Sequence, residues 1–404
     1  MKGTRSADDP RLARLLARTD REQDQLTRAF SRPHLARVAA ALAPFLFGGN
    51  DHERAQLAAR RVTRGVHTAY ARHIRALERD YRSHRFHQAH GGTSSVFNAD
   101  LDRWLDGGPE ALGPLAIASV QRAGVVRERA IRALGRRPEA PVLALLLVRL
   151  NDPVAQVRGA ARAALEKRLV PANAAVFARY LPLVEGMATW VRTAGDALAE
   201  RIQALLEREP LTLREYSRHR DADVRMGCYR LLARRHRGHE QMALVLRAAF
   251  ADGDPRVRHL AATLALDLQY TPKSLRPALL DDMWRDRSPR IRRTALRELC
   301  RLGQAERYVR ASVFDVNADV RFVARQQALR LELGIQYRAT ALAALAAPDS
   351  DKRQLVAALA TLSDNGMQAD CATVDRFRHH AIAAVRREAD RTARILECDL
   401  QETL

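Results

Sequence analysis

The fold is decided by one stretch, Asp152-Pro153-Val154-Ala155-Gln156-Val157-Arg158-Gly159-Ala160-Ala161-Arg162-Ala163-Ala164-Leu165. An aspartate followed by proline is typical of a helix start, because Asp caps the N-terminus and Pro is tolerated in the first turn. Val157, Ala161 and Leu165 are spaced by four residues, which places them on one face of the helix that follows. The small residue in the middle allows a neighbouring helix to approach closely. The stretch therefore predicts a turn followed by a tightly packed helix.

The same pattern recurs along the chain. Each of eight copies has Val or Ile before an arginine, with small or apolar residues four and eight positions after that Val or Ile. The arginines are Arg127, Arg158, Arg192, Arg225, Arg258, Arg292, Arg321 and Arg386. Successive copies are 31, 34, 33, 33, 34, 29 and 65 residues apart. The last interval is about two periods, so it predicts a degenerate copy near Lys352-Arg353-Gln354-Leu355.

An apolar helical stretch precedes many of these turns, for example residues 142–148. Each unit is therefore predicted to be a helix, a short turn and a second helix. This pattern resembles the short HEAT-like repeats of phycobilisome-lyase-type proteins, and the resemblance covers about residues 109–404. It implies an all-α fold, a right-handed α-solenoid of about nine HEAT-like helix pairs with an N-terminal helical cap.

The domain organisation follows from where the repeats begin. Residues 1–90 lack the motif and are predicted to form a separate helical cap, because the end of a repeat array needs a special element. Glycine pairs at Gly91-Gly92 and Gly107-Gly108 mark residues 91–108 as a linker. The repeat region is then 109–404.

Composition narrows the class of protein. Apolar residues make up 47% of the 404 residues, enough for a sizeable core, and aromatic residues only 5%. No apolar run reaches the length of a membrane span, and residues 1–9 lack the apolar core of a secretory signal. Four cysteines stand far apart without a CxxC pair, which predicts reduced thiols and a cytoplasmic protein. The cysteines are Cys228, Cys300, Cys371 and Cys398.

The net charge is strongly positive. There are 68 basic and 47 acidic residues, which gives +21, and only four of the basic residues are lysine. An excess of this size favours an anionic partner. We expect an acidic protein segment, with DNA or RNA as the alternative.

The repeated arginines divide into two predicted sets. The arginine directly after each Val or Ile is expected to form a structural ladder with turn aspartates. These aspartates are Asp152, Asp221, Asp252, Asp286, Asp315 and Asp349. The second set lies five to six residues after the Val or Ile, or one step beyond the ladder, and is expected on a concave face that binds the partner. It comprises Arg132, Arg162, Arg230, Arg293, Arg297, Arg325, Arg387 and Arg391.

Few acidic residues accompany the second set, chiefly Asp196 and Asp390, so the concave face is predicted to be electropositive along much of its length. Only Tyr229 and Phe322 are placed to stack on bases there, which weakens binding of single-stranded nucleic acid. The phosphate backbone of duplex nucleic acid, or an acidic protein segment, fits this predicted face better.

Catalytic patterns are weak. His84, His87 and His90 are spaced by three residues but have no carboxylate within the run, so they are read as a solvent-facing helix end rather than a metal site. A resemblance to deoxyhypusine hydroxylase, a HEAT-like enzyme, would imply a di-iron site built from four His-Glu pairs. This chain has only His52-Glu53 and His239-Glu240. We therefore expect no metal, no cofactor and no catalytic residue.

One enzymatic alternative stays open, a HEAT-like alkylpurine DNA glycosylase. That chemistry needs tryptophan and aspartate side chains gathered around an exposed nucleotide on a basic face. The candidates are Trp190, Trp284 and Asp196. They match no motif, so a non-enzymatic scaffold or adaptor is the predicted function, and the sequence leaves its oligomeric state open.

Overall fold

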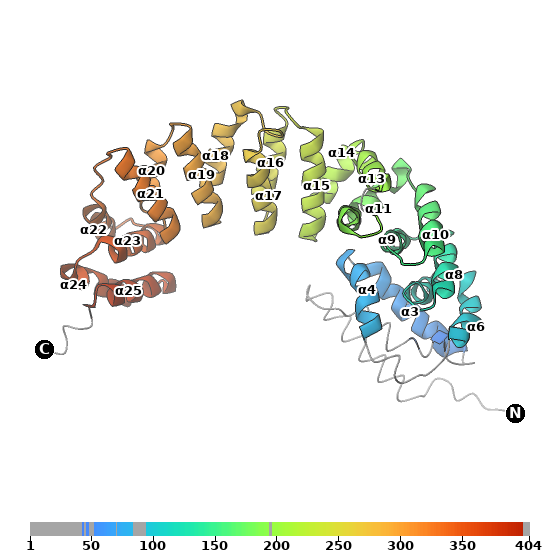
Figure 1. Ribbon diagram of the computed structural model, residues 1–404. Coiled ribbons are helices and arrows are strands. Elements are labelled where there is room, and N and C mark those ends of the chain that lie inside the picture. Colours follow the sequence, from blue (N-terminus) through green and yellow to red (C-terminus); the bar gives the residue numbers. More distant parts are fainter. Residues whose placement is uncertain are drawn as a thin grey trace. The chain divides into compact units, whose positions relative to one another are not determined.

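The computed structural model describes residues 43, 46–47, 52–69, 71–83, 94–193 and 196–398. All regular secondary structure in these ranges is helical, and they contain no strand, which confirms the predicted all-α class (Figure 1). The chain divides into two compact units, Met1–Arg235 and His236–Leu404. This boundary falls inside the predicted repeat region. Residues 1–42 of the predicted cap and the histidines His84, His87 and His90 lie outside the described residues.

The first helices of the first unit are α3 (His52–Thr68), α4 (Ala71–Ser83) and α6 (Ser94–Leu105). Helix α6 occupies most of the stretch predicted to be a linker. Helix α3 packs against η1 (Pro109–Ala111) and α7 (Leu112–Ala118). A Cβ atom at Gly113 would lie 2.6 Å from the backbone nitrogen of Thr63, so glycine is required for this close approach. The N-terminal helices are thus packed directly on the helices that follow them.

The rest of the first unit consists of short helices joined by tight turns. They are α8 (Gly124–Gly135), α9 (Ala140–Arg149), α10 (Ala155–Glu166), η2 (Pro171–Asn173), α11 (Ala174–Arg179), α12 (Leu181–Gly186), η3 (Met187–Thr189), α13 (Ala197–Glu207), α14 (Pro210–Tyr216) and α15 (Ala222–Arg235). Consecutive helices pack in pairs, α7 with α8, α9 with α10 and α14 with α15. Helices α8 and α10 also pack against each other, so neighbouring pairs are in contact.

The second unit repeats this arrangement. Its first helices are α16 (Met242–Phe250), α17 (Pro255–Leu266), η4 (Lys273–Leu275), α18 (Arg276–Trp284), α19 (Pro289–Arg301), α20 (Glu306–Ser312) and α21 (Ala318–Arg330). Helix α16 packs with α17, α18 with α19 and α20 with α21, and α19 also contacts α21. Figure 1 shows these pairs following one another within the unit.

The last helices of the second unit have a core of their own. They are α22 (Tyr337–Ala346), α23 (Lys352–Asn365), η5 (Gln368–Asp370), α24 (Cys371–Arg378) and α25 (Ala383–Ile395). Leu345, Leu359 and Val374 are buried in this cluster together with Val385 of α25. Helix α23 begins at Lys352, where the degenerate copy was predicted.

The repeated small residues are buried as predicted. Each lies four residues after a Val or Ile and is fully inaccessible to solvent, because the paired helices approach most closely there. They are Ala130, Ala161, Cys228, Ala261, Ala295, Ala324 and Ala389. Burial raises the pKa of the Cys228 thiol to about 12, which keeps it protonated and inert at neutral pH.

One predicted copy is out of register. Val191 is 86% exposed and precedes the helix, which begins after Asp196, whose side chain accepts a hydrogen bond from the N–H of Leu198. The buried residues of α13 are Leu198, Ile202 and Leu206, which keep the offsets of four and eight. The motif therefore begins seven residues later than the interval from Val157 predicts. In this register Ala199, not Arg192, follows the apolar residue.

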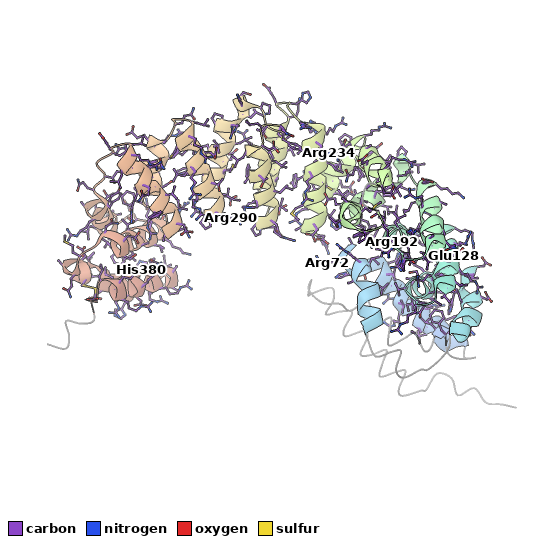
Figure 2. All side chains as sticks on the ribbon, in the orientation of Figure 1. Arg72, Glu128, Arg192, Arg234, Arg290 and His380 are labelled. Carbon is purple, nitrogen blue, oxygen red and sulfur yellow. A yellow bond between two sulfur atoms is a disulfide. The ribbon has the colours of Figure 1, made fainter. Side chains whose placement is uncertain are left out.

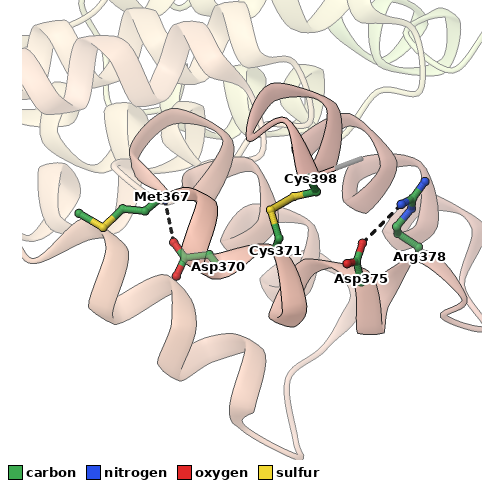
Figure 3. Close-up of a disulfide and its surroundings, with 6 residues drawn as sticks. All are labelled: Met367, Asp370, Cys371, Asp375, Arg378 and Cys398. Carbon is green, nitrogen blue, oxygen red and sulfur yellow. Dashed lines mark hydrogen bonds and ion pairs between the residues drawn. A yellow bond between two sulfur atoms is a disulfide. The ribbon is translucent and has the colours of Figure 1, made fainter. Parts of the chain in front are cut away.

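The expectation of four reduced thiols was wrong for one pair. Cys371, at the start of α24, and Cys398, after α25, form a disulfide with their Cα atoms 5.4 Å apart (Figure 3). The two residues are 27 positions apart in sequence, and the packing of α24 against α25 brings them together. Cys228 and Cys300 are free thiols. Within the described ranges, no helix combines the length and the apolar character that crossing a membrane requires.

Candidate anion-binding surface

The ladder arginines first bind the backbone of their own turn. Seven of the eight predicted arginines donate from Nη1 to carbonyl oxygens that lie five or six residues earlier. For Arg292 these are the carbonyls of Asp286 and Arg287, at 2.9 and 3.0 Å. The guanidinium thus holds the turn closed against its own helix. Arg192 is the exception, because its exposed side chain lies outside any helix.

Three ladder arginines also bind the turn aspartate of the next helix pair. Nε and Nη2 of Arg127 contact the carboxylate of Asp152 at 2.8 and 2.9 Å. The other two pairs are Arg292 with Asp315, at 2.6 Å, and Arg258 with Asp286, at 3.1 Å. All six of these residues are buried. The structural role predicted for these three arginines therefore has a direct geometric basis.

The ion pairs keep the buried Asp152 carboxylate charged. Burial alone would raise the pKa of the Asp152 carboxyl, but the guanidinium groups of Arg127 and Arg149 hold its pKa below the usual range. Arg321 departs from the pattern, because it binds Asp364 near the end of α23 at 2.7 Å rather than the turn residue Asp349, which is exposed.

The turn aspartates have a second, local role. The Oδ1 atom of Asp152 accepts a hydrogen bond from the N–H two residues later, at 2.9 Å. Asp252, Asp286 and Asp315 make the same contact. Such a side-chain acceptor fixes the turn that starts the next helix.

Histidine replaces aspartate at this position in two turns. Nδ1 of His219 accepts from the N–H of Asp221 at 3.1 Å, and Nδ1 of His380 accepts from the N–H of Ile382 at 3.1 Å. In both cases the preceding helix pair lacks the ladder arginine, since Ala199 and Val356 occupy that position in α13 and α23. A neutral imidazole at His219 supplies the acceptor without a buried charge, so this turn needs no guanidinium partner.

Asp221 itself was predicted to bind a ladder arginine of the repeat before it. The structure instead brings Arg72, from helix α4, to its carboxylate at 3.4 Å. Figure 2 labels Arg72 on this helix. The Asp221 side chain is almost fully buried, whereas Arg72 is partly exposed. Helix α4 thus supplies a positive charge beside this turn, where the out-of-register α13 has no arginine at the ladder position.

The predicted electropositive face is largely neutralised by carboxylates. Six of the eight arginines have an acidic partner, and this expectation is corrected accordingly. The ion pairs are Arg132 with Glu128, Arg162 with Asp196, Arg230 with Glu185, Arg293 with Asp319, Arg325 with Asp364, and Arg391 with Glu388. Only Arg297 and Arg387 are exposed without a contacting carboxylate among the described residues.

The residues of the glycosylase alternative each have a structural contact. Trp190 is buried and faces the guanidinium of Arg75 at 5.8 Å. The indole N–H of Trp284 donates to the Ser312 hydroxyl at 2.8 Å. Asp196 caps α13 and binds Arg162. The structure therefore assigns packing and capping contacts to these side chains.

The remaining predicted side chains that the structure describes do not gather into a site. Tyr229 is buried, so it offers no stacking surface, whereas Phe322 is 64% exposed. His239 and Glu240 are exposed. No group of three or more His, Cys, Asp or Glu side chains forms a candidate metal site in the described part of the chain.

Two basic hollows were missed by the sequence analysis. The first, of about 440 Å³, lies between α3 and η1 and is lined by Arg60, Arg64 and His67 together with Glu110. The second, of about 270 Å³, is lined by Arg179, Glu215, Tyr216, Arg218 and His219. The spacing of Arg60, Arg64 and His67 by four and three residues was the available signal for one helix face. It was overlooked because α3 lies outside the repeats.

Comparisons with known proteins give no family for this chain. No family model matches it, and no curated protein matches it. A crystal structure described as an engineered protein is 15% identical, covers 89% of this chain and 99% of its own, and has a TM-score of 0.24. A likeness this weak carries no argument about fold or function.

Proposed function

We propose that this protein is a non-enzymatic scaffold built from about nine HEAT-like helix pairs, arranged as a right-handed solenoid, that binds an acidic protein segment. The observation that carries this proposal is the recurring ladder, in which an arginine closes its own turn and binds the next turn's aspartate. A contact that passes from each pair to the next is what a repeat scaffold requires.

The charge pattern supports a protein partner over nucleic acid. On the predicted binding set, most arginines stand beside carboxylates such as Glu185 and Asp319. A nucleic-acid backbone, with a negative charge at every phosphate, would be repelled by these carboxylates. An acidic segment with neutral residues between its charges avoids them, and Arg297 and Arg387 offer guanidinium groups that no described carboxylate contacts.

Binding of a labelled acidic peptide tests the proposal. A fluorescein-labelled peptide of alternating glutamate and glycine should bind the full chain, as measured by fluorescence anisotropy. Duplex DNA of equal charge should bind more weakly at about 0.15 M salt. The double variant Arg297→Glu with Arg387→Glu should keep its helical circular dichroism and lose peptide affinity.

The matched control is Arg310→Glu with Arg301→Glu, because both of these arginines are exposed but bind carboxylates of their own helices. If the full chain binds DNA tightly and the peptide not at all, the partner is nucleic acid and the proposal is wrong.

A further inference from the structure

The two basic hollows of the first unit adjoin each other. Arg179, which lines the second hollow, donates from Nη2 to the carbonyl oxygen of His67 at 2.9 Å. His67 lines the first hollow. A single hydrogen bond therefore separates the two, and one extended ligand could reach both.

The arginines of these hollows differ in ion pairing from those predicted on the concave face. Arg60, Arg64 and Arg218 are exposed, and no described carboxylate forms an ion pair with them. Elsewhere in the described chain, most arginines of the predicted binding set are neutralised by a contacting carboxylate. Unpaired guanidinium groups that gather around two cavities provide free charge for an incoming anion.

The second hollow also has fixed donors. Its Arg179 is held by the His67 carbonyl and by the ring of Tyr180, which lies 5.4 Å from the guanidinium carbon. Because Nδ1 of His219 accepts from the backbone, a neutral imidazole carries its proton on Nε2 and is a donor there. Donors that are held in place lose little entropy when they bind a ligand.

A buried polar atom next to this hollow has no partner. The Tyr180 side chain is fully buried, and its hydroxyl makes no hydrogen bond. This hydroxyl lies close enough to Arg179 and Tyr216 to interact electrostatically with both. An unpaired buried hydroxyl is costly, so a polar ligand group that reached it beside Arg179 would relieve that cost.

Each hollow also contains one carboxylate, Glu110 in the first and Glu215 in the second. These negative charges would repel a polyphosphate chain. They match a peptide in which acidic residues alternate with neutral or basic ones, because the basic or amide groups of such a peptide can face the carboxylates.

We propose that these adjoining hollows, formed by α3, α11 and α14, are the anchor site for the acidic protein segment, with one carboxylate of the segment bound in each hollow. Arg60 and Arg64 bind the first carboxylate, and Arg179 and Arg218 bind the second. The inference rests on the proposed function and moves its principal contact from the predicted concave-face arginines to the two hollows of the first unit.

The test uses the full chain and the same glutamate–glycine peptide. Arg64→Glu with Arg218→Glu removes one free guanidinium from each hollow, and both side chains are exposed, so the fold should be kept. Affinity should fall at least about tenfold, because two desolvated contacts reverse sign. The control Arg122→Glu with Arg208→Glu changes two exposed arginines of the same unit outside the hollows. It should change affinity less than about twofold.

Four results would overturn the inference. If the Arg64/Arg218 variant binds as tightly as the wild type, or if the control loses as much affinity, the site lies elsewhere while the proposed function stands. If the wild-type chain does not bind the peptide at all, the proposed function itself is wrong. If only duplex DNA binds and the hollow variant abolishes that binding, the site takes phosphate and the assignment to a protein segment is wrong.

Discussion

Turns that contain a buried aspartate differ from turns that contain a histidine at the same position. At Asp286 and Asp315 the acceptor is a carboxylate, and an arginine of the preceding pair binds it. At His219 and His380 the acceptor is an imidazole nitrogen, and the preceding helix pair has no arginine at the ladder position. The choice of acceptor therefore follows the presence or absence of a charge one helix pair earlier.

The physical reason is the cost of burying a charge. A buried carboxylate without a partner is strongly unfavourable, whereas a neutral acceptor costs little if it is hydrogen-bonded. The histidine turns are then stabilised by other means. Arg72 binds Asp221 beside the first, and the Cys371–Cys398 disulfide joins the helices on both sides of the second.

The largest effect is expected from breaking an aspartate turn. Arg292→Ala leaves the buried Asp315 carboxylate without its guanidinium, and this should cost about 3–5 kcal/mol of stability. Arg158→Ala is the matched control, because Arg158 binds only the carbonyls of its own turn, at 2.8 and 3.0 Å. It should cost about 1–2 kcal/mol. Urea unfolding followed by circular dichroism measures both, and equal losses would contradict a special role for the ion pair.

The disulfide beside His380 should be worth nearly as much. Its two cysteines are 27 residues apart, and closing a loop of that length removes about 3.5 kcal/mol of unfolded-state entropy. Reduction, or Cys371→Ser with Cys398→Ser, should speed amide hydrogen exchange in α24 and α25 by the corresponding factor. Exchange in α16 to α19 should not change. Unchanged exchange in α24 and α25 would show that their core alone holds them.

Removing the Arg72 side chain tests whether its ion pair with Asp221 stabilises the His219 turn. Arg72→Ala leaves the buried Asp221 carboxylate without this contact, which should cost about 1–3 kcal/mol. The double variant with Asp221→Asn should recover much of the loss, since an amide needs no counter-charge. If the double variant is no more stable than Arg72→Ala, the ion pair is not what ties α4 to this turn.

The smallest effect is a pH dependence at His219. Burial lowers the pKa of this imidazole from its ordinary value near 6.5. The neutral form, which accepts the hydrogen bond, therefore stabilises the fold above about pH 6.5, and this contribution is lost as the pH falls through the lower folded-state pKa. A loss of up to about 1 kcal/mol is expected. His219→Asn should flatten this part of the stability profile, and an unchanged profile would refute the assignment.

Acid should act on the Asp152 turn in a different pH window. The pKa of Asp152 is held below its ordinary value near 3.9, so the stability that Asp152 contributes is complete above that value and is lost only at lower pH. The Asp152 turn and the His219 turn should therefore lose their contributions to stability in different pH ranges of one unfolding titration.

Much of the fold could be predicted from the sequence, because the helices and their buried faces follow from the local spacing of apolar and small residues. The spacing by four placed Ala161 and Ala295 in the core, and the Asp-Pro turn placed the start of helices such as α17. The ladder role of Arg258 and Arg292 also followed from local pattern, because their partners occupy a fixed position in the next turn.

Contacts between residues far apart in sequence could not be predicted in this way. Arg230 meets Glu185, 45 residues earlier, and Arg72 meets Asp221, 149 residues later. Counting charges by position in the repeat therefore overestimated how many arginines of the predicted concave face lack a carboxylate partner. The register of α13 was missed because the interval of 34 residues to Val191 looked regular. The later triplet of Leu198, Ile202 and Leu206 was the correct signal.

The ladder also governs how the length of this chain can change. In the second unit Arg258 binds Asp286 and Arg292 binds Asp315, so each pair offers an arginine forward and an aspartate backward. Deleting one whole pair, such as α18 with α19, leaves Arg258 facing Asp315 with the same chemistry. Duplication of a pair is equally neutral. A histidine turn blocks such an event, because a gained or lost pair there can leave a buried aspartate without its arginine. Gene rearrangement is therefore expected to lengthen or shorten the array between aspartate turns and to spare α13 and α23.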